Sequence, residues 1–200
     1  MLPLDQRLEI LTQHIIRARM HFDLWWFSVG EQSGPRIAET LEQYAEFFRF
    51  DVQAHFASMI LHSSAVWDNR GDVISLPRLA RDILDPSLFP VDRSTLDKVG
   101  ELKSAAIGIQ TIRHEAIAHR NEGHDYDALF RNAGVMPDRI PDMMAEWLDV
   151  TNRLRSIRGM PHSGFRDLPL AHYQKLIRHL GGSDVQPMSG LDDIPDHAGS

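Results

Sequence analysis

STLDKVGELKSAAIGIQTIRHEAIAHRN, residues 94–121, is the stretch that decides the fold class. Its apolar residues step by three or four positions, which is the spacing of one face of an α-helix and not of a strand. Asp92 or Ser94 is expected to cap this helix, and Gly123 to close it after about Asn121. The stripe consists of Leu96, Val99, Leu102, Ala106, Ile109, Ile112, Ala116 and, in last place, His119.

The same period runs through most of the chain. It predicts further helices over about 4–28, 37–67, 76–84, 126–132, 141–157 and 170–180, of which 37–67 is one long helix or two joined near 49–51. No stretch alternates with the period of a strand. The sequence therefore predicts an all-α fold, a bundle of four main antiparallel helices with short additional helices, in a single domain over 1–182. Residues 183–200 are rich in Asp, Gly, Pro and Ser, and are expected to be a disordered acidic tail.

The composition excludes several classes of protein. Hydrophobic residues make up 42% and charged residues 24% of the 200 residues, as in ordinary globular proteins. The chain has no cysteine, which excludes disulfide frameworks, thiolate metal sites and cysteine nucleophiles. No stretch reaches the roughly 18 apolar residues of a membrane span, and the first residues do not resemble a signal peptide. We therefore expect a cytoplasmic protein with no membrane partner.

The net charge of −7 is not typical of a protein that binds double-stranded nucleic acid non-specifically, because such proteins are usually strongly basic. Eighteen of the 21 cationic residues are nevertheless arginines. Arginine binds phosphates and carboxylates through two parallel hydrogen bonds, which lysine cannot do. The alternative explanation for the many arginines is a GC-rich gene, with the side chains in surface ion pairs.

Histidine, with eleven copies, is the abundant chemical group. His14 and His21 are seven residues apart, as are His55 and His62, so each pair lies on one helix face. Facing helices of a bundle can hold a metal ion through such residues. One hypothesis is therefore a metal-dependent enzyme that uses His55, His62 and a histidine from another helix. The usual carboxylate partners are missing, because no Glu-x-x-His occurs, and core-edge or surface histidines are the alternative.

Arg113-His114-Glu115-Ala116-Ile117-Ala118-His119 carries the second constellation. His114 and His119 are five residues apart, about 140° around an α-helix, so they do not form the zinc-protease motif. Read from Arg113, the segment is an Arg-x5-His pair at a helix end. Pairs with four to six intervening residues occur five times, about as often as chance predicts: Arg7/His14, Arg49/His55, Arg113/His119, Arg155/His162 and Arg166/His172.

Context favours Arg113/His119 among the five pairs. His119 ends the apolar stripe, and Ala116 and Ala118 before it are small enough to let a second helix or a substrate approach. Glu115 is four residues from His119 and is placed to hold its imidazole by a hydrogen bond. The polar run that follows suits the rim of a cleft, and its members are Arg120, Asn121 and Glu122. The alternative is a purely structural role for both residues. Arg113 would then pair with a nearby acid, and His119 would be a half-buried histidine at a helix end, where the helix dipole favours a cation.

The Arg-x5-His helix resembles the motif of the HEPN superfamily of all-α bundles, many of which are metal-independent ribonucleases of toxin–antitoxin and phage-defence systems. Together with Ser58–Leu61, Trp67-Asp68 and Ile74–Leu79, it is similar to the abortive-infection U-type branch over roughly residues 36–160. The resemblance implies a homodimer that cleaves RNA with Arg113 and His119. His114, Glu115, Arg120 and Asn121 would support them, with no metal or other cofactor and with an antitoxin protein as a further partner.

Metal-free RNA cleavage needs a base for the 2′-hydroxyl, an acid for the leaving oxygen and a cation beside the phosphate, roles that suit His119 and Arg113. A two-fold axis would bring together two copies of His119, since one imidazole does not reach both sides of one phosphorus. The main rival is a catalytically silent HEPN-like bundle that binds a protein or nucleotide partner. Glu115 favours this rival, because the U-type branch tends to carry a lysine there and a carboxylate repels phosphate.

Overall fold

The computed structural model describes residues 2–30, 34–68, 70, 72–84, 93–118 and 126–181. All regular structure in these ranges is helical, which confirms the all-α prediction. None of the described helices is long and apolar enough to cross a membrane. In chain order the α-helices are α1 (Leu4–Val29), α2 (Gly34–Gln43), α3 (Ala45–Val66), α4 (Leu76–Ile83), α5 (Arg93–Glu101), α6 (Lys103–Arg113), α7 (Tyr126–Ala133), α8 (Ile140–Ile157) and α9 (Leu168–Gly181).

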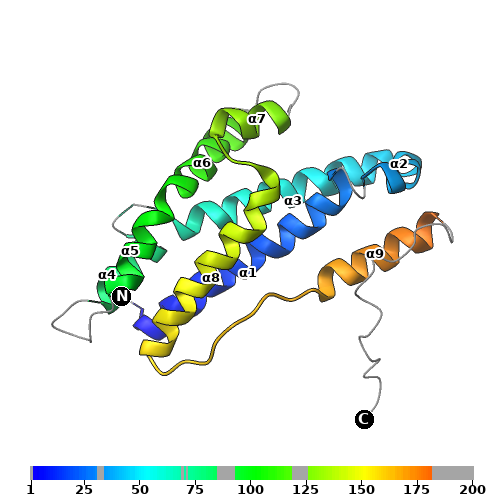
Figure 1. Ribbon diagram of the computed structural model, residues 1–200. Helices are drawn as coiled ribbons and strands as arrows, with labels where there is room; N and C mark the ends of the chain where they lie inside the picture. The colour runs from blue at the N-terminus through cyan, green and yellow to red at the C-terminus, as the bar shows by residue number, and fades with distance from the viewer. Residues whose placement is uncertain are drawn as a thin grey trace, which may run out of the picture.

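α1 is the central helix, packed along α3 and α8 and in contact with α2, α4 and α9 (Figure 1). Pro3 precedes its first turn, where a missing N–H has no cost. Leu8, Leu11 and Ile15 are fully buried, and the stripe continues into Phe22 and Trp25. Trp25 lies among other aromatic rings, so the aromatic end of α1 belongs to the core.

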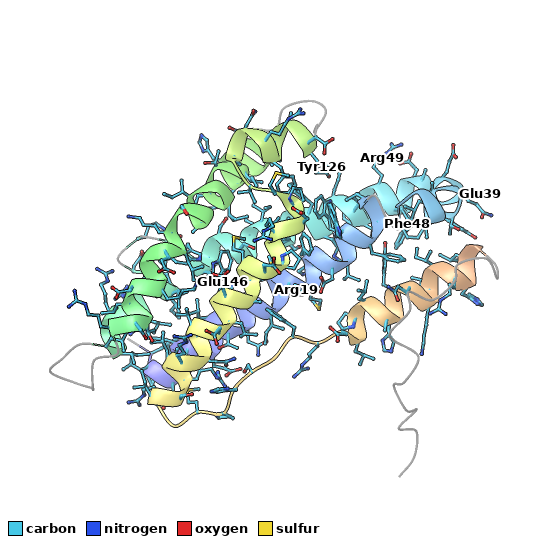
Figure 2. The ribbon with its side chains drawn as sticks, viewed as in Figure 1. Arg19, Glu39, Phe48, Arg49, Tyr126 and Glu146 are labelled. Atoms are coloured by element: carbon cyan, nitrogen blue, oxygen red, sulfur yellow. The ribbon has the colours of Figure 1, made fainter. Side chains whose placement is uncertain are left out.

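The predicted break near 49–51 is wrong, since the helix is interrupted at Tyr44, between α2 and α3. The interruption lets α2 turn toward α9 while α3 runs back along α1 (Figure 1). Ile37 of α2 and Phe48 of α3 then pack with Phe27 and Ile177 in a small second core. Figure 2 shows Phe48 on the side of α3 that faces α9.

The predicted helix over 94–121 is divided into shorter pieces. α5 and α6 are separated at Leu102, and a π-helix over His114–Ala118 follows α6. Their apolar residues nevertheless form the single stripe that the sequence predicts, and Ile109 and Ile112 are almost completely buried. A local change of helix type therefore left the direction of the buried face intact.

α8 begins after a short 3-10 turn over Pro137–Arg139 and lies against α1. The segment between α8 and α9 follows α1, where the guanidinium of Arg19 lies 5.2 Å from the ring centroid of Phe165 (Figure 2). Residues 182–200, which include the predicted acidic tail, lie outside the described residues.

Charged side chains tie the helices together at the edge of the core. Arg7 of α1 is buried and donates to Asp82 near the end of α4 at 2.5 Å. Arg155 of α8 is buried and donates to Glu9 of α1 at 2.8 Å. Only the arginine of each pair is buried, so removal of Asp82 or Glu9 is the costly change, because a guanidinium then stays out of water without that carboxylate.

Gly108 provides a stability test. A Cβ added there would lie 2.8 Å from the carbonyl oxygen of Ala133 and would collide with Val135, whereas one added at Gly100 would meet nothing within 4 Å. We expect Gly108→Ala to lower the free energy of unfolding by about 1–3 kcal/mol, as overpacking does. Gly100→Ala, the matched control in α5, should raise it by about 0.5–1 kcal/mol through helix propensity. Urea unfolding followed by circular dichroism measures both, and equal effects would contradict the close contact.

Candidate functional site

Arg113 is the last residue of α6, and the chain continues from it as a π-helix over His114–Ala118. The predicted α-helix up to about Asn121 is therefore wrong for these five residues. A π-turn is wider than an α-turn and is found frequently at functional sites. Spacings calculated for an α-helix, including the 140° between His114 and His119, consequently do not apply across it.

The described part of the motif presents its charged groups outward. Arg113 and His114 are exposed, Glu115 is half-buried, and Ala116 points into the core. His119, Arg120 and Asn121 lie outside the described residues.

Arg113 lies on the side of the site where α3 ends. Hydrogen bonds from Arg70 hold the pKa of Asp68 below its ordinary value, and the charge of Arg113 adds to this effect. Within the described ranges, however, Arg113 has no carboxylate within ion-pair distance. Its guanidinium is exposed and lies near Asp68 without an ion pair to any described acid.

The five Arg-x4–6-His pairs differ in what their arginines do. Arg7 and Arg155 are buried and bind carboxylates, so these two pairs are structural. Arg49 is exposed and lies 3.5 Å from Glu46. Arg113 and Arg166 are exposed, with no carboxylate bound among the described residues. Arg113 directly precedes His114, which lines a cavity.

That cavity has a volume of about 640 Å³ and lies between the end of α3, α4, α5 and α6. His114, which directly follows Arg113, is part of its wall. Trp67 forms an apolar part of the wall, and Arg81 and Lys103 are its other basic residues. The motif therefore stands at the edge of a hollow that is apolar and basic.

A second cluster is a quartet of histidines between α1 and α3: His14, His21, His55 and His62. The Nδ1 atoms of His14 and His62 are 2.9 Å apart, and so are those of His21 and His55. The rings of His21 and His62 stack, with centroids 5.9 Å apart. The seven-residue spacing predicted that the two histidines of each helix lie on one face. The pairing of α1 with α3 could not be read from the sequence.

The quartet continues into a hydrogen-bonded chain toward α9. His55 Nε2 lies 3.4 Å from Asp51, which accepts a hydrogen bond from the Tyr173 hydroxyl at 2.7 Å. That hydroxyl is 3.2 Å from Ser28 Oγ. Burial raises the pKa of Tyr173 well above its ordinary value, so this group stays protonated and able to donate.

Burial disfavours the charged form of three histidines of the quartet. Burial lowers the pKa of His21 and His62 to about 4, assisted by the charges of neighbouring histidines and of Arg17. Burial and Arg17 also lower the pKa of His14. A neutral imidazole donates from one nitrogen and accepts at the other, so each 2.9 Å contact needs one donor and one acceptor. Protonation of both rings of a pair would leave two N–H groups facing each other.

No three histidine, aspartate or glutamate side chains in the described ranges converge as a metal ion requires. The Nδ1 atoms of the quartet are instead bound to each other in pairs. The described residues thus offer no site for the metal-dependent hypothesis that named His55 and His62.

The quartet generates a pH prediction. Well above pH 6.5, His21 and His62 are neutral in both the folded and the unfolded chain. Between pH 6.5 and about 4, His21 and His62 are protonated in the unfolded chain but not in the folded one. The free energy of unfolding therefore decreases as the pH falls. After allowance for partial exposure, we expect a loss on the order of 2 kcal/mol over this range. Urea unfolding at a series of pH values measures it.

His21→Gln/His62→Gln should show a smaller loss over the same range, because glutamine does not titrate. His172→Gln, which changes an exposed histidine of α9, is the control and should leave the loss unchanged. An equal pH dependence in the double variant and the wild type would contradict the assignment.

Neither a curated protein nor a solved structure matches this chain. The family model HEPN_AbiU2, with the description AbiU2, matches residues 1–159, from α1 through the end of α8, and leaves α9 outside. This match confirms the resemblance drawn from the Arg-x5-His helix and the segments before it. The chain belongs to the AbiU2 branch of the HEPN superfamily.

Proposed function

We propose that this protein is a metal-independent endoribonuclease of a phage-defence or toxin system, which cleaves RNA phosphodiesters at a dimeric site containing Arg113 and His119. The observation that carries the proposal is the position of Arg113. It is exposed, ends α6 before a π-turn, and directly precedes His114, which lines a cavity together with Arg81 and Lys103. Membership of the HEPN superfamily supports the same reaction class.

The reaction requires two proton transfers. A base takes the proton of the 2′-hydroxyl as its oxygen attacks the phosphorus. An acid gives a proton to the 5′-oxygen that leaves, and the strand ends in a cyclic phosphate. An imidazole suits both roles because its ordinary pKa is near neutrality. Arg113 would bind the phosphate oxygens, whose negative charge grows in the transition state.

The proposed site is shared by two chains. One His119 cannot reach the attacking and leaving oxygens on opposite sides of one phosphorus. A two-fold axis supplies a second copy, and brings His119 of one chain to Arg113 of its partner. Glu115 would orient His119, Arg120 would supply a second cation, and His114 and Asn121 would complete the rim. In a toxin system an antitoxin protein would be the further partner, and the compartment would be the cytoplasm.

Cleavage of single-stranded RNA in excess EDTA tests the proposal. We expect Arg113→Ala and His119→Ala each to lose about 10²-fold or more in rate, the usual contribution of a general acid–base or of an electrostatic group. Arg166→Ala and His172→Ala, which remove an exposed pair of the same spacing, are the matched controls and should retain full activity. Full activity in His119→Ala, or its abolition by EDTA, would contradict the mechanism.

Mixing wild-type and His119→Ala chains tests the shared site. After exchange of subunits, a mixed dimer holds one His119, whereas the proposed reaction needs two. We expect the mixed dimer to be inactive, so at constant total protein the rate should fall as the square of the wild-type fraction, measured with the same substrate. If each chain used only its own pair, the rate would instead fall in direct proportion to that fraction.

The catalytically silent bundle is the second candidate, favoured by the carboxylate of Glu115 beside Arg113. The same proteins distinguish it. Equal toxicity of the wild type and His119→Ala in cells, together with no RNA cleavage by the wild type, would favour a binding role for a protein or nucleotide.

A further inference from the structure

The cavity beside the motif has the size and walls of a ligand site. Its volume of about 640 Å³ falls in the range of small-molecule and cofactor pockets, roughly 300–1,000 Å³. Trp67 and Val99 give it an apolar floor, and both are more than 90% buried. Ile107 is at its rim and is 58% exposed, which is unusual for so large an apolar side chain. This combination favours a ligand with a flat, apolar body.

The basic residues of the cavity favour an anionic group on the same ligand. Arg81 and Lys103 line it, and no aspartate or glutamate does so among the described lining residues. Neither of these cations binds a carboxylate within the described ranges. Lys98, which directly precedes Val99 in α5, is by contrast held by Glu146 of α8 at 2.9 Å. Cations without acidic partners beside an apolar floor suit a phosphate joined to an aromatic ring.

The cavity also leads toward the motif. Lys103, Ile107 and His114 are four and seven residues apart, so they follow one face of α6 and the turn after it. Arg113 is the neighbour of the last of them. The wall of the cavity therefore reaches the end of α6 at which Arg113 is exposed.

We propose that this cavity binds one nucleotide of the RNA strand, with its base against Trp67 and Ile107 and its phosphate between Arg81 and Lys103. The inference rests on the proposed endoribonuclease activity, for which the cavity would set the position of the strand. A free mononucleotide has the same chemistry, so the experiment separates the two sources.

A 2′-O-methyl RNA octamer is the probe, because it lacks the hydroxyl that attacks and stays intact on the wild-type protein. We expect Lys103→Glu and Ile107→Glu each to weaken its binding about ten-fold or more, measured by fluorescence anisotropy. The matched controls are Arg49→Glu and Phe50→Glu, at exposed positions near the far end of α3 (Figure 2), which should bind as the wild type does. All four positions are exposed, and thermal melts identify any variant that fails to fold.

Octamer binding that is unchanged in both cavity variants would overturn the inference. So would binding of adenosine 5′-monophosphate that depends on Lys103 and Ile107 while octamer binding does not, since the cavity would then take a free nucleotide. Quenching of tryptophan fluorescence that Trp67→Phe removes reports the mononucleotide. If the wild type cleaves no RNA but both variants lose octamer binding, the nuclease proposal fails and the cavity remains an RNA site. If both variants bind the octamer and cleave RNA as the wild type does, the cavity inference fails and the nuclease proposal stands.

Discussion

Burial of the apolar stripe of α1 is the constraint on which the rest of the structure depends. Leu8, Leu11 and Ile15 are fully buried, and α3, α4, α8 and α9 are all arranged around this one helix. At roughly 25 cal/mol for each Å² of apolar surface removed from water, each such side chain contributes about 1.5–3 kcal/mol. A polar substitution in the stripe would therefore affect both apolar cores, since α1 contributes Trp25 to one and Phe27 to the other.

α3 lies between the two groups of chemically active residues and separates them. One of its faces carries His55 and His62 toward α1, where both are half-buried. Near its other end, the carbonyl of Ser64 accepts a hydrogen bond from Gln110 of α6 at 2.9 Å, and Trp67 turns to the cavity. Histidines in the first group stabilise helix contacts, whereas the basic residues near the second face solvent. Histidine abundance alone consequently pointed to the quartet and not to the cavity.

Most helices could be predicted from their apolar period, because burial decides both the period and the packing. The helix predicted over 4–28 is α1, and the one predicted over 141–157 is α8 with a one-residue difference. The π-turn after Arg113 could not be predicted, since Ile112 and Ala116 are spaced as in an ordinary α-helix. The break at Tyr44 depends on the packing of α2 against α9, a contact between distant parts of the chain. For the site, the sequence indicated Arg113 but not the cavity beside it, because Lys103 and Arg81 come from separate helices.

The net charge of −7 is a poor guide to the field at the candidate site. Charges separated by more than about 10 Å are largely screened at ordinary ionic strength, so the nearest groups decide the local potential. Asp5, Glu9 and Asp82 are held by arginines at the α1 side of the molecule, and Asp68 is held by Arg70. In each of these pairs the arginine compensates the charge of the carboxylate. Within the described ranges, Arg113 and Lys103 of α6 bind no carboxylate in this way, so no ion pair compensates their charges there.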